Sequence, residues 1–247
     1  MTGAGLFSFP APSAAVFLPS FMPLSMSRAG FARAAPFLLF MALLGLRGAL
    51  GSVHDGGFDV RWVYAVSVAL VGAVLMAFRR EYVELSRAHW PTAAELALAT
   101  ATGVAVFALW IHLDAPWMTL GTPAAAFAPV DAQGRLDLPL IAVRWVGAAL
   151  LVPVMEELFW RSLLMRWLHD CPFIAVDPRH VGLRAVVLST LAFMLVHVPW
   201  LAAIVAGLAY AWLYRRTGKL WTAVLAHAVT NGALGAWVVA TRSWAFW

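Results

Sequence analysis

The sequence has few charged residues and almost no cysteine. Only 12% of its 247 residues are charged, against about 25% in a typical soluble domain. The single cysteine, Cys171, excludes an internal disulfide, and a cysteine-based metal site would need more thiols at fixed spacings. The pattern H-E-x-x-H, which places two histidines and a glutamate around zinc on one helix, is also absent. These absences disfavour a soluble domain, a disulfide scaffold and a common zinc motif.

Hydrophobic residues, in contrast, make up 63% of the chain, and the mean hydropathy is +0.82. Long apolar stretches of this kind are typical of proteins that span lipid. The net charge of +5 would suggest nucleic acid as a partner of a soluble protein. Here the cations occupy short loops between apolar runs, so we expect membrane lipids and no nucleic acid as partners.

The apolar runs predict an all-α fold, a polytopic transmembrane helix bundle of about seven spans. The fifth and sixth runs are short and could form a shallow hairpin that does not cross the whole membrane. Because the loops are short, any chemistry must lie within the bundle. The predicted spans are about Ala34–Leu50, Trp62–Phe78, Ala93–Leu113, Leu138–Leu164, Val181–Val198, Trp200–Tyr214 and Leu220–Ala240.

The charges of the loops predict the orientation of the chain. Basic residues cluster before the first span and after the second, fourth and sixth, which places all of them on one side of the membrane; the other side carries aspartates. Since cytoplasmic loops are enriched in Lys and Arg, we expect a multi-pass protein of the inner membrane with a cytoplasmic N-terminus. The basic residues are Arg28, Arg33, Arg79, Arg80, Arg87, Arg166, Arg179, Arg184, Arg215, Arg216 and Lys219.

Residues 1–27 contain four prolines and no charged residue. Prolines break helices, and the lack of a basic stretch argues against a signal peptide. We interpret residues 1–27 as a disordered extension or a mis-set start, and residues 28–247 as a single transmembrane domain.

Glu156 and Glu157 are the most informative residues, because ionisable groups within a membrane span are costly and are functional candidates by default. Arg161 follows Glu157 by four residues and shares its helix face. A structural ion pair between them would explain one glutamate and leave the other unexplained. We therefore predict that one glutamate pairs with Arg161 and that the other acts as a general base.

His197, His227 and Asn231 are the other candidates. Alone, His197 is more typical of a structural hydrogen bond, and His227 with Asn231 could equally join two helices. At about 1.5 Å per residue from the cytoplasmic ends, Glu157, His227 and Asn231 lie about 15, 10 and 16 Å deep, and His197 about 22 Å. A shallow hairpin would bring His197 closer, so one cavity could hold the set.

Such a set could hydrolyse a peptide bond, with a glutamate to activate water and histidines and an amide to stabilise the oxyanion. A metal site formed by two histidines and a glutamate is the alternative; we favour metal-free glutamate catalysis and expect no cofactor. Two further alternatives are a non-catalytic immunity or assembly partner and a proton-coupled transporter.

Three motifs in order, Glu156-Glu157-x-x-x-Arg161, Phe193-x-x-x-His197 and His227-x-x-x-Asn231, resemble the CAAX prenyl endopeptidase and bacteriocin-processing (CPBP, Abi) family of intramembrane proteases. The resemblance covers about residues 140–240. It implies that Glu156 activates water with help from His197 and that Glu157 and Arg161 support the site. His227 and Asn231 would stabilise the oxyanion. The substrate would be the C-terminal region of a membrane-anchored protein or peptide.

A narrower set of segments is similar to the CAAX protease-related proteins of exosortase systems, which implies a role in processing C-terminal sorting tails. The segments are Arg144-Trp145-Val146-Gly147, Val152-Pro153, Ala206-Gly207-Leu208-Ala209-Tyr210, Leu213-Tyr214-Arg215-Arg216-Thr217 and Trp244-Ala245-Phe246-Trp247.

Overall fold

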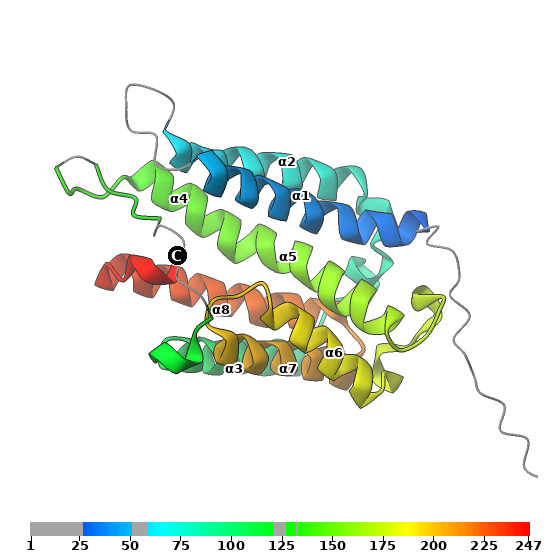
Figure 1. The fold of residues 1–247 in the computed structure, drawn as a ribbon. Coiled ribbons are helices and arrows are strands. Elements are labelled where there is room, and N and C mark those ends of the chain that lie inside the picture. The colour runs from blue at the N-terminus through cyan, green and yellow to red at the C-terminus, as the bar shows by residue number, and fades with distance from the viewer. Residues whose placement is uncertain (1–26, 51–58, 121–126, 132) are drawn as a thin grey trace, which may run out of the picture.

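The computed structural model describes residues 27–50, 59–120, 127–131 and 133–247 (Figure 1). The predicted disordered extension therefore lies, apart from Ser27, outside the described residues. Within them the chain forms seven helices and no strand, with one isolated β-bridge between Val130 and Leu136. The all-α bundle predicted from the sequence is confirmed.

Six of the helices are single elements: α1 Arg28–Leu50, α2 Val63–Ala77, α3 Ala93–Trp110, α6 Leu183–Met194, α7 Trp200–Thr217 and α8 Leu220–Thr241. The remaining one, called the fourth helix below, runs without interruption from residue 138 to residue 165. It consists of α4 Leu138–Val146, the π-helix η6 Gly147–Leu151, α5 Val152–Glu157 and the π-helix η7 Leu158–Met165.

Five of these helices are long and apolar enough to cross a membrane: α1, α2 with the short turn before it, α3, the fourth helix and α8. The other two form the hairpin α6–α7. With 12 residues, α6 is about 18 Å long, against a hydrocarbon core of about 30 Å.

The tip of this hairpin is covered by the segment before it. The backbone N–H of Leu120 donates to Val198 O (2.8 Å), and the indole of Trp200 donates to Trp117 O (3.0 Å). The ring of His197 at this tip lies 5.8 Å from the ring of Trp110, the last residue of α3. Of the two hairpin helices, α6 is short, whereas α7 has 18 residues, as many as α3.

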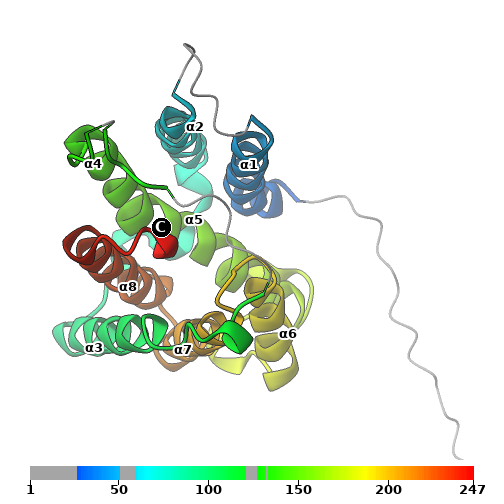
Figure 2. The ribbon, with the colours of Figure 1, turned by 60° about the vertical axis from the view of Figure 1, so that its left-hand side comes forward.

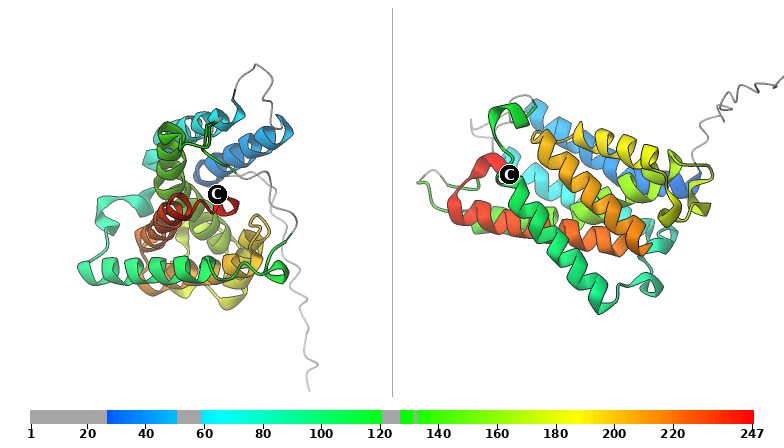
Figure 3. Two further views of the ribbon diagram at one scale, coloured as in Figure 1. Left: turned by 90° about the vertical axis from the view of Figure 1, so that its left-hand side faces the viewer. Right: turned by 90° about the horizontal axis from the view of Figure 1, so that it is seen from below.

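The fourth helix and α8 lie in the middle of the bundle (Figure 2). On one side they pack against α1 and α2, and on the other against α3, α6 and α7. Seen from below, α3, α7 and α6 form the opposite face of the bundle (Figure 3, right). The two central helices are the ones that carry most of the predicted site residues.

Glycines allow the helices to approach closely. A Cβ atom on Gly103 of α3 would lie 2.4 Å from Ala226 O of α8, and one on Gly207 of α7 would lie 2.8 Å from Thr190 of α6. Small residues at helix contacts are typical of membrane bundles, where close van der Waals packing replaces the hydrophobic effect between helices.

A buried cluster of charges joins α1 to the fourth helix. The Arg33 side chain is completely buried and donates to both carboxylate oxygens of Glu84 (2.8 and 2.6 Å) and to Ser162 Oγ (3.0 Å). Arg166 donates to Ser162 Oγ from the next turn (2.7 Å). Arg33 thus lies within α1, whereas the sequence places it in the loop before the first span, and it acts as a structural residue.

Glu84 belongs to the linker between α2 and α3, and its pKa reflects this cluster. Burial raises the pKa of the Glu84 carboxyl, but the hydrogen bonds from Arg33 and Ser162 and the charge of Arg33 outweigh it. The pKa therefore lies below that of an ordinary glutamate, and the carboxylate stays ionised in the folded protein.

Candidate active site

Glu157 is completely buried in the fourth helix, and both of its oxygens face a charged or polar partner. Oε1 accepts a hydrogen bond from His227 Nδ1 (2.9 Å), and Oε2 lies 3.2 Å from Arg161 Nε. The predicted pairing of one glutamate with Arg161 is therefore confirmed, and Glu157 is that glutamate.

Arg161 makes three contacts with residues of the hairpin α6–α7. Its Nη2 donates to Gly207 O (3.3 Å), and its guanidinium lies over the rings of Phe193 (4.7 Å) and Tyr210 (5.6 Å). Such cation–π contacts are strong where water is excluded, and this side chain is only 2% exposed. Arg161 therefore has one fixed position, which in turn fixes Glu157.

Glu156 differs from its neighbour in having no ion-pair partner among the described residues. It is buried, with 7% exposure, and its Oε2 atom, like that of Glu157, has no hydrogen-bond partner there. The Nη1 atom of Arg161 is buried and unpartnered in the same way. A buried polar atom without a partner is destabilising, so these atoms mark a place where water or a substrate would be held.

His197 lies at the tip of the α6–α7 hairpin. Its Nδ1 donates to Phe193 O one turn earlier (2.8 Å), and its ring packs on the Phe193 ring at 4.2 Å. Since a carbonyl can only accept, the proton of the neutral ring sits on Nδ1 and leaves Nε2 free to accept. His197 also interacts electrostatically with Glu156, His227 and Arg161, so the hairpin brings it to the same region.

His227 projects from α8 toward the fourth helix. Its Nδ1 must be the donor to Glu157, because an ionised carboxylate only accepts. Its ring stacks on Tyr210 at 4.9 Å and 19°, and the Tyr210 hydroxyl donates to Thr230 Oγ1 (2.8 Å). The orientation of His227 is therefore set from two directions, as is usual for histidines that serve a defined role.

Asn231 lies one turn after His227 and donates from Nδ2 to Ala148 O (2.9 Å). The π-helix η6 explains why this carbonyl is available. Within it the N–H of Val152 bonds to Gly147 O, five residues back. The same pattern would pair Ala148 O with Pro153, which has no N–H. Asn231 therefore satisfies a carbonyl of the fourth helix and keeps a second N–H on its amide.

Of the predicted residues, Glu157 thus contacts both Arg161 and His227. His197 lies close enough to interact electrostatically with Glu156, Arg161 and His227. Asn231 is placed against Ala148 instead and makes no contact with the carboxylates in the described hydrogen bonds.

Sequence reasoning did not single out Tyr210, which contacts both Arg161 and His227. Tyr210 follows Gly207, whose carbonyl binds Arg161, by three residues, so the two lie on one face of α7. This spacing was the signal in the sequence that could have identified Tyr210. Arg144, by contrast, is in the fourth helix but lies over Tyr64 and Phe127, far along the helix from the glutamates.

The side chains do not form an evident metal site. Among the described residues, no three histidine, cysteine, aspartate or glutamate side chains gather as ligands. Glu157 and His227, the closest pair, already bind each other. The donor set does not fit zinc in this arrangement, and no step proposed below uses a metal.

Residues 138–233 match the family model of the type II CAAX prenyl endopeptidase Rce1-like proteins. This segment, about two fifths of the chain, is similar to the CAAX protease family. The matched segment contains the fourth helix, α6, α7 and α8 as far as Gly232 and Ala233, and thus all six candidate residues. Curated proteins and solved structures gave no match.

The match supports a CAAX-type intramembrane protease in general terms. Together with the five membrane-spanning helices, it makes the chain a multi-pass membrane protein. The α1, α2 and α3 helices precede the matched segment, and they supply packing and the Arg33–Glu84 cluster.

Proposed function

We propose that this chain is a CAAX-type endopeptidase that cleaves a peptide bond near the C-terminus of a membrane-associated protein, with a water molecule activated by Glu156. The observation that carries the proposal is the division of the glutamate pair. Glu157 makes a hydrogen bond with His227 and an ion pair with Arg161, whereas Glu156 makes neither kind of contact among the described residues.

Glu156 is suited to the role of general base. Its free Oε2 can accept a hydrogen bond from water, and the free Nε2 of His197 can accept a second one. Two acceptors around one water molecule orient a lone pair of its oxygen toward the substrate carbonyl. Proton transfer to Glu156 then accompanies the attack of the water oxygen on the carbonyl carbon.

The resulting tetrahedral oxyanion needs hydrogen-bond donors. His227 can provide one through Nε2 when its ring is doubly protonated, while Nδ1 keeps its hydrogen bond to Glu157. Asn231 can provide another through the second N–H of its amide. When the C–N bond breaks, the proton on Glu156 passes to the departing amine, which restores the carboxylate and balances the reaction.

The proposal can be tested with the full chain in proteoliposomes containing a lipid-anchored peptide. A farnesylated peptide with a C-terminal CAAX sequence and its unfarnesylated counterpart should both be offered, in water enriched in ¹⁸O. We expect cleavage of at least one peptide, with one ¹⁸O atom in the new carboxyl group by mass spectrometry. A matched chain carrying both Glu156→Gln and His197→Ala should give no product.

Two results would contradict the proposal. Equal cleavage by the wild-type chain and the double variant would remove Glu156 and His197 from the reaction. No cleavage of any offered peptide, together with proton flux into the same liposomes, would favour a transporter. An inner-membrane location with a cytoplasmic N-terminus, and a role beside exosortases, are further proposals that rest on the loop charges and the segment resemblance given above.

A further inference from the structure

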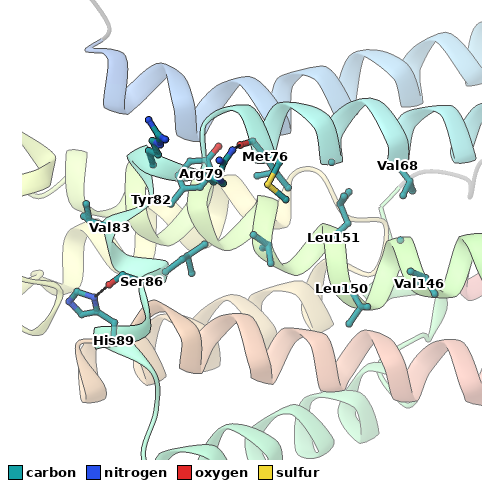
Figure 4. A pocket seen from close by; sticks show the side chains of 16 residues that line it. Val68, Met76, Arg79, Tyr82, Val83, Ser86, His89, Val146, Leu150 and Leu151 are labelled. Atoms are coloured by element: carbon teal, nitrogen blue, oxygen red, sulfur yellow. Dashed lines mark hydrogen bonds between the residues drawn. The ribbon is translucent and has the colours of Figure 1, made fainter.

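A groove lies on the outer side of the fourth helix, away from the candidate active site. It has a volume of about 870 Å³ and is formed by α2, the linker between α2 and α3, and the part of the fourth helix between Val146 and Val154 (Figure 4). None of the six candidate site residues lines it. Its volume is within the range of about 300–1,000 Å³ found for small-molecule sites.

The walls of the groove are apolar along most of its length. Val68, Gly72 and Met76 line it from α2, and Leu150 and Leu151 line it from the fourth helix. Val68 and Met76 are eight residues apart in α2, which corresponds to about 12 Å along the helix. This is close to the thickness of one leaflet, about half of the 30 Å hydrocarbon core.

The groove is closed at one end and open along its side. At the closed end α2 and the fourth helix touch, since a Cβ atom on Gly147 would lie 2.6 Å from Val68 and 2.7 Å from the Tyr64 hydroxyl. Along the open side, Leu150 near the closed end is 62% exposed and Met76 toward the other end is 60% exposed. An occupant could therefore enter sideways from the lipid.

The open end carries positive charge that nothing in the linker neutralises. Arg79 and Arg80 line this end, together with Ser86 and His89. The two acidic residues of the linker are engaged elsewhere, because Glu81 pairs with Arg28 (2.8 Å) and Glu84 with Arg33 (2.6 Å). Because the arginines of α1 pair with both carboxylates, no acidic residue of the linker pairs with Arg79 or Arg80 at the open end of the groove.

We propose that this groove binds an anionic phospholipid, with one acyl chain between α2 and the fourth helix and the phosphate at Arg79 and Arg80. The shape and the charge both support this occupant: the apolar section has the length of one leaflet, and basic side chains at the end of a helix bind anionic headgroups. Ser86 and His89 would add hydrogen bonds to the headgroup. The site is separate from the peptidase chemistry and does not depend on it.

Binding can be measured by native mass spectrometry of the purified full chain titrated with dioleoyl phosphatidylglycerol or dioleoyl phosphatidylcholine. The wild-type chain should retain phosphatidylglycerol preferentially. In the variant Arg79→Ala/Arg80→Ala its affinity should fall about 30-fold, equivalent to about 2 kcal/mol for two basic side chains. The matched control Arg184→Ala/Arg216→Ala, which removes two exposed arginines from other helices, should bind as the wild type does.

A second pair of variants tests the acyl-chain section. Leu150→Trp fills the groove from an exposed position and should also reduce phosphatidylglycerol binding at least tenfold, whereas Leu183→Trp on α6, at a similarly exposed apolar position, should not. Equal binding of the two lipids, equal losses in the arginine variant and its control, or unchanged binding in Leu150→Trp would each overturn the proposal. So would complete displacement of the lipid by millimolar inorganic phosphate, which would identify a phosphate site without an acyl-chain groove.

Discussion

The Glu157–Arg161 pair gives a quantitative test of the site's construction. Replacing Glu157 with leucine leaves the Arg161 guanidinium, 2% exposed, without its carboxylate, and replacing Arg161 with methionine leaves Glu157 without its cation. Removing one partner of a buried ion pair costs about 3–5 kcal/mol. The gross attraction at 3.2 Å, about 5 kcal/mol at an effective dielectric constant of 20, is of the same size.

The double variant Glu157→Leu/Arg161→Met should be more stable than the sum of the two single losses predicts. Additive effects would give about 6–10 kcal/mol, but removing both charges together is nearly neutral. One cost remains, because the buried Nδ1–H of His227 loses its acceptor, which is worth about 1–3 kcal/mol. We therefore expect the double variant to lie about 1–3 kcal/mol below the wild type.

Reversible unfolding in mixed micelles with increasing dodecyl sulfate, followed by the fluorescence of the 13 tryptophans, measures these free energies. The exposed pair Arg28–Glu81 is the control, and its coupling energy should be below about 1 kcal/mol. If Glu157→Leu were as stable as the wild type, or if the double variant showed the sum of the single losses, the fixed buried pair on which the site depends would be refuted.

Three further predictions concern single residues. His197→Ala should lower the cleavage rate about 100-fold without changing the unfolding transition, because only the free Nε2 of this ring is needed; an unchanged rate in the peptide assay would remove His197 from the site. Asn231→Ala should reduce kcat by about 10²–10³ with little change in KM, as expected for an oxyanion donor, and a change confined to KM would indicate a substrate-binding role instead. Glu84→Gln should destabilise the chain by about 3 kcal/mol at neutral pH by leaving Arg33 unpaired. Because the folded-state pKa of Glu84 is lowered, the wild type has this stabilisation above the ordinary glutamate pKa and loses it as pH falls through the lowered value. Between pH 3 and pH 7, the free energy of unfolding of the variant should therefore depend less on pH than that of the wild type.

The sequence was sufficient to predict the bundle and the main ion pair. Apolar runs of membrane-spanning length are readable because lipid requires them, and five of the seven appear as long apolar helices. The spacing of four residues between Glu157 and Arg161 places them on one face of any helix. Both predictions depend on local geometry alone, which is why they could be made.

The rest depends on contacts between distant parts of the chain. The contacts of Arg161 with Phe193 and Gly207 come from the α6–α7 hairpin, and Tyr210 joins the site only because α7 packs against α8. The sequence predicts Arg33 to be a loop cation, whereas in the folded protein it binds Glu84 and Ser162 in the interior. The amide of Asn231 donates to Ala148 O, which the π-helix η6 leaves available, and the periodicity of the sequence does not predict this π-helix.

The variant Glu156→Gln tests most directly whether Glu156 is the glutamate of the pair that activates water. Its rate of peptide cleavage in proteoliposomes should be compared with that of the wild type and of Glu81→Gln, which makes the same substitution in an exposed ion pair. We predict a fall of about 10²–10⁴-fold for Glu156→Gln with an unchanged unfolding transition, and wild-type activity for Glu81→Gln. Retention of more than a tenth of the wild-type rate by Glu156→Gln would contradict the claim.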